Sequence, residues 1–288
     1  MAGPSEVRVE VVANREVAPA YFSLRLAGPA HLARFRPGQF LMLGWDEGLD
    51  PLLPRAMSIR RVWPSPQKSE VRGARCEVEI LYKVFGRCTT LLAAMRPGRR
   101  LRALGPLGNA FEVPRSVTQA LLVAGGIGVP PIAALAEAVG SGRAAHRAAM
   151  TAFLGGRSKA DLLCVADFRR AGAKVHLATE DGSAGHKGLV TELLEQFLCS
   201  GTADRRPPTA RSQTVLYACG PHPMLAALAP IAEKYDLPYR ASLEANMACG
   251  FGACMGCVVP TRGGEGHRTY RLVCKDGPVF DGRDILWI

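Results

Sequence analysis

The sequence predicts an antiparallel β-barrel, then a doubly wound parallel-sheet domain, then a small cysteine-containing segment. Three observations predict this order. Short strand-like runs separated by turn residues fill residues 1–112, strand and helix patterns alternate four times over 115–236, and four of the nine cysteines fall within the last 40 residues. Alternating strands and helices are typical of a parallel sheet with helices on both faces.

The first segment consists of short strands joined by turns. Residues 7–11 alternate apolar and polar side chains, as a half-buried strand does. Further strands are predicted at 21–26, 39–43, 56–59 and 76–83, with a polar connection over 63–75 and a short helix over 89–95. Several short strands with turn signals between them indicate an antiparallel barrel or sandwich.

The second segment has the pattern of a parallel sheet. Residues 120–124 are all apolar, as expected of a strand that is buried on both faces. The other predicted strands are 148–154, 174–178 and 214–218, and the predicted helices are 132–139, 161–171, 189–199 and 224–235. Residues 200–213 form a polar loop rich in Arg and Pro, and 237–288 are short and glycine-rich.

Composition and charge exclude several classes of function. The chain has 288 residues, of which 48% are hydrophobic and 21% charged, so we expect ordered domains with sizeable cores. The net charge is +11, but no run of five like charges forms a nucleic-acid-binding tail. The first 20 residues lack an apolar signal region, and glycines and Pro130-Pro131 interrupt the uncharged stretch 116–136. We expect a cytoplasmic protein that binds neither nucleic acid nor membrane.

The cysteines near the C-terminus have the spacing of an iron–sulfur site. Cys249, Cys254 and Cys257 form a C-x4-C-x2-C motif, and Cys274 follows 17 residues later. This is the plant-type spacing for a [2Fe–2S] cluster, and interspersed glycines let a short loop wrap it closely. A structural zinc site is the alternative, but zinc favours paired C-x2-C motifs and this segment has one.

Two junctions of the second segment could hold a dinucleotide. Gly125, Gly126 and Gly128 follow the apolar strand and precede a helix, where backbone N–H groups can bind a pyrophosphate. A tight strand–helix connection can need the same glycines for packing alone. Cys219 ends the predicted strand 214–218, and ligands bind at the carboxyl ends of such strands. The alternative for Cys219 is a small buried apolar residue.

Two stretches of the first segment could contact an anionic cofactor. Arg55-Ala56-Met57-Ser58 places an arginine at the start of a strand, where it can bind a phosphate. Leu81-Tyr82-Lys83 ends another strand, and Gly86-Arg87-Cys88-Thr89 then leads into a helix whose start favours an anion. A surface arginine and a half-buried strand are the alternatives.

These motifs in this order resemble the ferredoxin–NADP reductase superfamily. They are Arg-x-x-Ser, Gly-x-x-Thr, Gly-Pro-x-Gly-x-x-Phe at 105–111, Gly-Gly-x-Gly-x-x-Pro and Cys-Gly-Pro. The segment 243–257, together with Val273 to Phe280, is more specifically similar to the electron-transfer subunits of type 1B dihydroorotate dehydrogenases. The resemblance covers nearly the whole chain.

The resemblance implies an FAD-binding barrel at 1–112, an NAD-binding domain at 115–236 and a [2Fe–2S] segment at 237–288. It implies a partner subunit that oxidises dihydroorotate to orotate at its FMN, in a heterotetramer that serves pyrimidine biosynthesis. Electrons would pass through the cluster and FAD to NAD⁺, with no side-chain acid or base required. The implied contacts are Arg55, Ala56, Met57, Ser58, Leu81, Tyr82, Lys83, Cys88 and Thr89 for FAD, Gly125, Gly126, Gly128 and Cys219 for NAD, and Cys249, Cys254, Cys257 and Cys274 for the cluster.

Some features depart from the resemblance or leave it open. Cys88 stands where the family usually has glycine, whereas Met57 fits the dihydroorotate branch. One alternative is the γ subunit of a hydrogenase or sulfur reductase, or another NAD(P)H-dependent flavin iron–sulfur reductase. A second, from another class, is a zinc-stabilised anion-binding module. NAD and NADP also remain open, because Arg157 and Ser158 could meet a 2′-phosphate or lie in a solvated loop.

Overall fold

A computed structural model describes residues 6–46, 50–64, 76–144, 147–200, 213–263 and 267–288. Packing divides the chain into two compact units. The barrel unit comprises Met1–Ala110, Ala245–Val258 and Leu272–Pro278, and the sheet unit comprises Phe111–Glu244, Val259–Arg271 and Val279–Ile288. The segments that follow residue 244 therefore contribute to both units. Of the predicted connection at 63–75, residues 65–75 lie outside the described residues, as does most of the predicted loop at 200–213. Trp63 and Pro64 belong to a strand that spans Arg55–Pro64.

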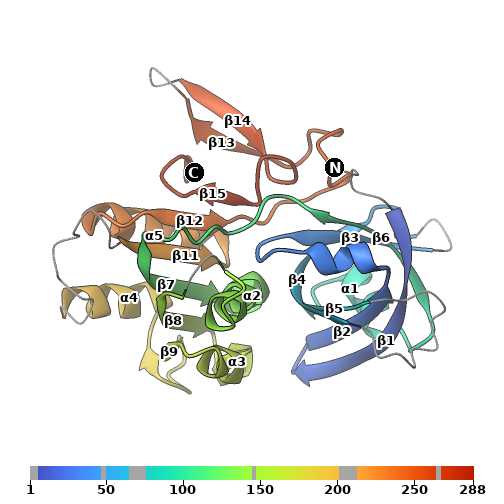
Figure 1. Cartoon of the computed structure of the whole chain (residues 1–288), viewed down its shortest axis with the longest axis horizontal. Coiled ribbons are helices and arrows are strands. Elements are labelled where there is room, and N and C mark those ends of the chain that lie inside the picture. Colours follow the sequence, from blue (N-terminus) through green and yellow to red (C-terminus); the bar gives the residue numbers. More distant parts are fainter. Residues whose placement is uncertain (1–5, 47–49, 65–75, 145–146, 201–212, 264–266) are drawn as a thin grey trace. The chain divides into compact units, whose positions relative to one another are not determined.

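The barrel unit is built around a closed antiparallel barrel (Figure 1). Its strands pair in the order β1-β2-β5-β4-β3-β6. They are β1 (Glu6–Ala18), β2 (Tyr21–Gly28), β3 (Phe40–Trp45), β4 (Arg55–Pro64), β5 (Cys76–Lys83) and β6 (Arg100–Leu107). The 3₁₀ helix η1 (Ala30–Arg34) and the helix α1 (Arg87–Ala93) complete it. Alternate side chains such as Val9, Val11, Leu24 and Leu26 fill the barrel core.

Two details of the barrel differ from the sequence prediction. The strand β6 was not predicted, because the arginines on its outer face mask the alternation of buried and exposed residues. In the structure Leu101 and Ala103 are buried while Arg100 and Arg102 point outward. The helix predicted at 89–95 instead spans Arg87–Ala93. The Asn14 side chain donates to the carbonyls of Leu92, Ala93 and Met95 at 2.8–3.3 Å, which stabilises this end.

The sheet unit contains a seven-stranded sheet in the order β10-β9-β8-β7-β11-β12-β15. The strands are β7 (Val117–Gly125), β8 (Ala149–Gly156), β9 (Lys174–Thr179), β10 (His186–Lys187), β11 (Gln213–Cys219), β12 (Tyr239–Ser242) and β15 (Val279–Asp281). All pairings are parallel except that of β15 with β12. The predicted doubly wound fold is thereby confirmed.

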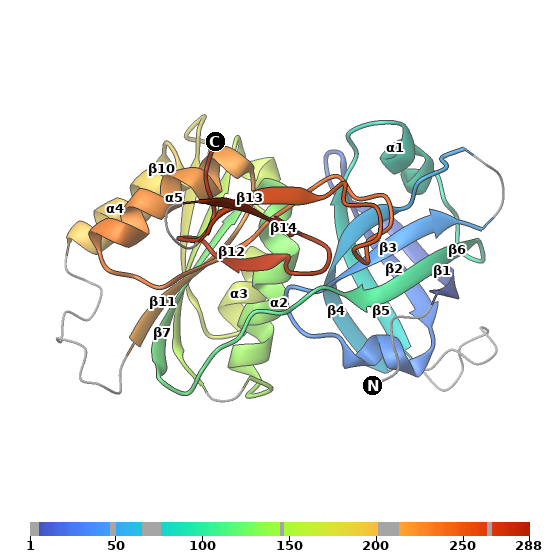
Figure 2. The same ribbon diagram turned by 90° about the horizontal axis from the view of Figure 1, so that it is seen from above.

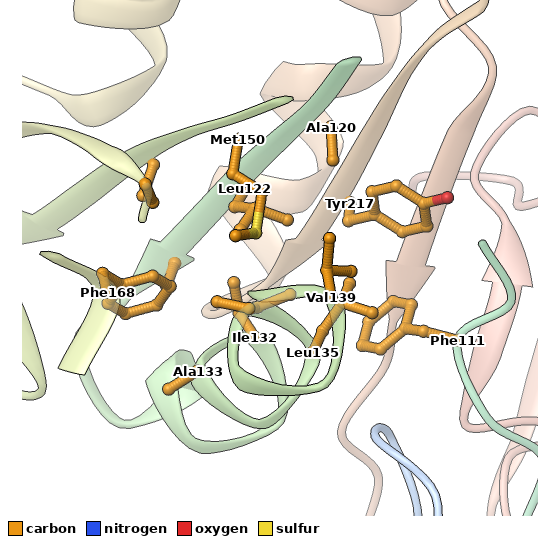
Figure 3. Packing of buried hydrophobic residues seen from close by; sticks show 14 of the residues in the cluster. Phe111, Ala120, Leu122, Ile132, Ala133, Leu135, Val139, Met150, Phe168 and Tyr217 are labelled. Atoms are coloured by element: carbon orange, nitrogen blue, oxygen red, sulfur yellow. The ribbon is translucent and has the colours of Figure 1, made fainter. Parts of the chain in front are cut away.

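Helices cover both faces of this sheet (Figure 2). The pair α2 (Val129–Gly140) and α3 (Val165–Arg170) packs on one face, and α4 (Val190–Cys199) and α5 (His222–Lys234) pack on the other. Figure 3 shows Ile132, Leu135 and Val139 of α2 pointing toward the sheet. The Tyr217 ring stands edge-on to Phe111, and its hydroxyl donates to the Glu112 carbonyl at 2.9 Å.

The remaining differences come from backbone geometry and short strands. The helix predicted at 161–171 begins only at Val165, because Cys164 adopts a left-handed conformation with φ 59°. Before it, the 3₁₀ helix η3 (Lys159–Asp161) forms a separate turn. The strands β12 and β15 and the hairpin of β13 (Val258–Arg262) and β14 (Arg268–Leu272) were not predicted. Among the described residues, no helix is long and apolar enough to span a membrane.

Candidate cofactor sites

The four cysteines of the C-terminal motif all belong to the barrel unit. Cys249 and Cys254 lie on the loop before β13, Cys257 adjoins that strand, and Cys274 follows β14. The Val273 N–H donates to the Cys257 carbonyl at 3.0 Å. This hydrogen bond holds the segment that contains Cys274 against the loop that contains the other three cysteines. The fold therefore brings Cys274 next to Cys257, 17 residues before it in the sequence.

The thiols form two pairs. Cys249 and Cys254 are hydrogen-bonded to each other, as are Cys257 and Cys274. Among the described residues, no three Cys, His, Asp or Glu side chains converge closely enough to hold one metal ion. A [2Fe–2S] cluster needs two thiolates on each of two irons, and the two pairs match that requirement. The pair Cys257 and Cys274 is buried, whereas Cys254 of the other pair is exposed.

Backbone N–H groups point at the sulfur atoms. The Cys249 Sγ accepts from the Cys254 N–H at 3.4 Å, and the Cys257 Sγ accepts from the Cys274 N–H at 3.5 Å. Burial favours the neutral thiol of Cys249, but hydrogen bonds from the backbone N–H groups of Cys254, Phe251 and Ala253 and from the Cys254 side chain outweigh it and lower the pKa of Cys249 to about 6. Burial, followed by the Cys257 thiol, raises the pKa of Cys274 to about 12. Donors aimed at sulfur fit thiolate ligands of a cluster.

Two glycines let this loop turn and approach the barrel. Gly250 has φ +81°, and a Cβ there would lie 2.3 Å from Cγ of Met42 on β3. Gly252 has φ +92°, and a Cβ there would lie 2.9 Å from Cδ of Lys275. A side chain at Gly250 would therefore lift the loop from the barrel wall.

The predicted flavin segments meet at one end of the barrel. Strand β4 pairs with β3 through Arg55, Ala56, Met57 and Ser58, and the described pairing of β4 with β5 starts at Ile59, opposite Ile80. The start of β4 therefore lies at the end of β5, where Leu81, Tyr82 and Lys83 lead into α1. All four residues Arg55 to Ser58 are half-buried, whereas Ile59 is buried.

The side chains at this end divide into structural and accessible groups. Tyr82 is buried, stacks on Phe22 and donates to the Asn14 carboxamide oxygen at 3.1 Å. Burial raises its pKa to about 12. Its contact with a flavin would have to come from the backbone. Lys83 is half-buried, with its Nζ 2.9 Å from the Tyr21 hydroxyl. The pyrophosphate contacts of Arg55 and Lys83 stay predictions.

The turn before α1 is closed by Thr89. Its hydroxyl accepts from the Phe85 and Gly86 N–H groups at 2.8 and 3.2 Å and donates to the Gly86 carbonyl at 3.0 Å. A Cβ at Gly86 would meet no atom within 4 Å, so the space beside this turn is open. Cys88, next to Thr89, is half-buried. The flavin contacts of Cys88 and Thr89 stay predictions.

The glycine turn of the sheet unit joins β7 to α2 through the 3₁₀ helix η2 (Gly126–Gly128). A Cβ at Gly128 would lie 2.5 Å from the Cys219 carbonyl oxygen, and one at Gly125 would lie 2.6 Å from the Met224 sulfur. Gly128 thus lets the turn after β7 approach the end of β11 closely, and Gly125 leaves room for the Met224 side chain of α5. Gly126, with φ +52°, has open space at its Cβ position. A ligand can approach the backbone there.

Cys219 is buried at the end of β11 and belongs to the core between the sheet and α2. It is the register partner of Ser242 on β12. Burial raises the pKa of its thiol, as does the nearby Glu244, while a hydrogen bond with Ser242 opposes the shift. The sequence did not predict that Ser242 and Glu244 are neighbours of Cys219. Their position just before the cysteine motif was the available signal.

Comparisons with known proteins show the family to which the chain belongs. A family model described as the iron–sulfur cluster binding domain of dihydroorotate dehydrogenase B matches residues 244–286, and an oxidoreductase NAD-binding domain matches 122–229. The dihydroorotate dehydrogenase B (NAD(+)) electron transfer subunit of Shouchella clausii is 38% identical over 281 residues, covering 97% of each chain. The chain belongs to this family of electron-transfer subunits. The Geobacillus thermodenitrificans member is 37% identical over 97% of this chain and 98% of its own.

Solved structures share the fold. A chain of an NADH-dependent reduced ferredoxin-NADP oxidoreductase has a TM-score of 0.77 and 26% identity, covering 97% of this chain and 90% of that one. The ferredoxin reductase of carbazole 1,9a-dioxygenase has a TM-score of 0.62 at 23% identity, covering 82% of this chain and 67% of that one, and shows the fold alone. The family's reductase-like barrel and sheet are therefore both present.

Proposed function

We propose that this chain accepts electrons from a catalytic partner subunit that oxidises dihydroorotate and delivers them to NAD⁺. One observation carries this proposal. Four cysteines form two pairs, Cys249 with Cys254 and Cys257 with Cys274, beside a reductase-type barrel. The support from relatives is a 38% identity over 97% of the chain to a protein named as such a subunit.

The residues fit the cofactors that this function needs. When bound, a [2Fe–2S] cluster carries single electrons, and FAD converts them into the hydride pair that NAD⁺ accepts. Cys249 and Cys254 would hold one iron and Cys257 and Cys274 the other. The N–H groups at 3.4 and 3.5 Å from the sulfurs stabilise the thiolates. The protein's part is to bind, orient and exclude water, without a side chain that moves a proton.

The barrel and the sheet would each hold one nucleotide cofactor. Arg55 and Lys83 offer charge to the FAD pyrophosphate, and Ala56, Met57, Ser58, Leu81, Tyr82, Cys88 and Thr89 line the same end. In the sheet unit, Gly126 offers open backbone to the NAD pyrophosphate at the start of α2. Gly125, Gly128 and Cys219 shape that turn by packing, because a Cβ at either glycine would overlap its neighbours.

Exposed apolar side chains suggest where the partner docks. Phe251 and Met255, which flank the exposed Cys254, are 54% and 59% exposed. Surfaces of this kind are commonly covered by a partner. Docking there would bring an electron donor to the outer cysteine pair. We propose that the complex is cytoplasmic, because none of the nine cysteines forms a disulfide. Its FMN-containing partner and its heterotetrameric assembly are what the family resemblance implies.

The substitution Cys254→Ser tests the proposal, with Cys199→Ser as a control that removes another exposed thiol. We expect Cys254→Ser to lose iron and dihydroorotate-dependent NAD⁺ reduction in the complex, while it keeps FAD and NADH oxidation by artificial acceptors. The Cys199→Ser control should keep iron, FAD and both activities. Zinc in place of iron, loss of FAD together with iron, or orotate formation by this chain alone would contradict the proposal. Reduction of NAD⁺ only with a hydrogenase partner would favour the γ-subunit alternative.

A further inference from the structure

The two cysteine segments of the barrel unit, Ala245–Val258 and Leu272–Pro278, carry few charges. Apart from the cysteines, their ionisable side chains are those of Lys275 and Asp276, which directly follow Cys274. A [2Fe–2S] cluster held by four thiolates has a net negative charge, and reduction adds one more negative charge. A cation close to the sulfur atoms therefore favours the reduced form of the cluster over the oxidised form.

The loop 249–254 brings its backbone close to sulfur atoms of both cysteine pairs. Three of its N–H groups are hydrogen-bonded to the Cys249 sulfur, and the N–H of Gly252, which lies among them, is hydrogen-bonded to the Cys274 sulfur. Cys249 and Cys274 also interact electrostatically with each other. Gly252 is therefore at the centre of the loop and next to the sulfur atoms.

The side chain of Lys275 lies across this same glycine. A Cβ at Gly252 would lie 2.9 Å from Cδ of Lys275, 3.3 Å from its Cβ and 3.6 Å from its Cγ. The aliphatic stem of Lys275 thus runs along the loop, and the ammonium is two bonds beyond the Cδ that lies nearest. The residue as a whole is exposed, as is usual for a lysine that packs its stem and leaves its charged end in water.

The two charges of the segment after β14 are used differently. The Asp276 carboxylate accepts from the Leu272 N–H at 2.7 Å, which closes the turn that holds Cys274. The Asp276 carbonyl accepts from the Asn109 carboxamide at 3.1 Å, which ties this turn to the barrel. Within the part of the chain that the structure describes, the Lys275 ammonium forms no ion pair. Its charge is therefore not neutralised by a paired carboxylate.

We propose that Lys275 raises the reduction potential of the cluster, because its positive charge stabilises the reduced form. The inference rests on the proposed function, since it requires that the four cysteines hold a [2Fe–2S] cluster. It adds a residue that binds no iron and yet determines how readily the cluster accepts an electron. The N–H groups of the loop act in the same direction, but the charge of Lys275 can be removed without changing the backbone.

The substitution Lys275→Met removes the charge and keeps an unbranched stem, whereas Lys275→Arg keeps the charge. The midpoint potential of the cluster is measured in the purified holoprotein by redox titration, with the EPR signal of the reduced cluster as the readout. At a fixed applied potential, we expect Lys275→Met to lower the ratio of reduced to oxidised cluster about threefold to tenfold, and a tenfold change corresponds to about 59 mV for one electron. Lys275→Arg should keep nearly the native ratio, and both variants should keep native iron and FAD contents.

The matched control is Lys187→Met, which makes the same change of charge in the sheet unit. The stem of Lys187 also packs on a glycine with positive φ, because a Cβ at Gly182, with φ +77°, would lie 3.1 Å from Cδ of Lys187. Lys187 does not belong to the cysteine segments, so Lys187→Met should leave the potential of the cluster unchanged.

Salt provides a second readout that a purely structural role would not alter. Between about 0.01 M and about 1 M ionic strength the Debye length falls from about 30 Å to about 3 Å, so the difference in potential between the native protein and Lys275→Met should shrink.

Three results would overturn the inference: an unchanged or raised potential in Lys275→Met, a decrease in Lys275→Arg as large as in Lys275→Met, or loss of iron from Lys275→Met, which would show that the side chain holds the loop in place. A native protein that contains no [2Fe–2S] cluster would instead overturn the proposed function.

Discussion

The close approach of two backbone turns in the sheet unit can be tested by one methyl group. In Gly128→Ala, the added Cβ would lie 2.5 Å from the Cys219 carbonyl oxygen and 2.5 Å from the Gly220 Cα. Both neighbours are backbone atoms, so no side chain can rotate away. The φ of Gly128 is −71°, which alanine adopts freely, so the whole effect is steric.

The size of the effect follows from that distance. Ordinary contact between such atoms needs about 3.5 Å, so the ends of β7 and β11 must separate by about 1 Å. Overpacking of this kind costs about 1–3 kcal/mol of unfolding free energy. For a unit of this size it lowers Tm by about 3 to 10 °C. A shift of about 1 Å in a binding turn can lower activity about 100-fold.

The assay is NADH oxidation by an artificial acceptor, together with Tm and with the FAD and iron content. Gly128→Ala should lose kcat/KM for NADH while FAD and iron stay bound, because the residues proposed to hold FAD and the cluster lie in the barrel unit. The control is Gly142→Ala, just beyond the other end of α2. Gly142 has φ +75° and open space at its Cβ position, so alanine there should lower Tm and leave the KM for NADH unchanged.

The outcomes separate the explanations clearly. If Gly128→Ala keeps both the native Tm and the native KM, the close approach of the two turns does not exist in solution and the reasoning fails. If Gly142→Ala raises the KM as much as Gly128→Ala does, a general loss of stability explains the effect, and the steric argument is wrong.

Two further predictions concern the C-terminal segments. Gly250→Ala should lose iron, because alanine is strained at φ +81° and its Cβ would lie only 2.3 Å from Cγ of Met42. Gly98→Ala, with φ +84° and open space at its Cβ position, should keep iron. Equal iron contents in the two variants would contradict the packing of the loop on the barrel. Asp281 is half-buried, which raises its pKa, but hydrogen bonds from Arg283, followed by Arg240, lower the pKa overall. The stabilisation it provides is therefore present above the ordinary carboxyl pKa of about 4 and is lost as pH falls through the lower, folded value. Asp281→Asn should lower Tm at pH 7, and the difference in Tm from the native protein should shrink below about pH 4. A difference that does not depend on pH would refute the stabilisation of Asp281 by Arg283 and Arg240.

Local patterns accounted for the main features of both units. Three features could be predicted without a structure, because each depends on residues that are neighbours in the sequence. They are the cysteine motif, the glycine turn and the alternation of strand and helix. The strand β6 was missed because Arg100 and Arg102 on its outer face obscured the buried Leu101 and Ala103. The helix α3 begins later than predicted because the backbone of Cys164 is left-handed, and the residue type at this position does not predict that conformation.

The sequence by itself determined which cysteines, glycines and basic residues the protein has for cofactor chemistry, because each motif lies within a few residues of chain. Only the tertiary structure decided how they are used. It paired Cys257 with Cys274 and Cys249 with Cys254, distinguished the packed Gly128 from the open Gly126, and placed the Lys275 stem across Gly252. The physical reason is that burial, close approach and pairing depend on atoms that the fold brings together, whereas spacing along the chain records only which atoms are available.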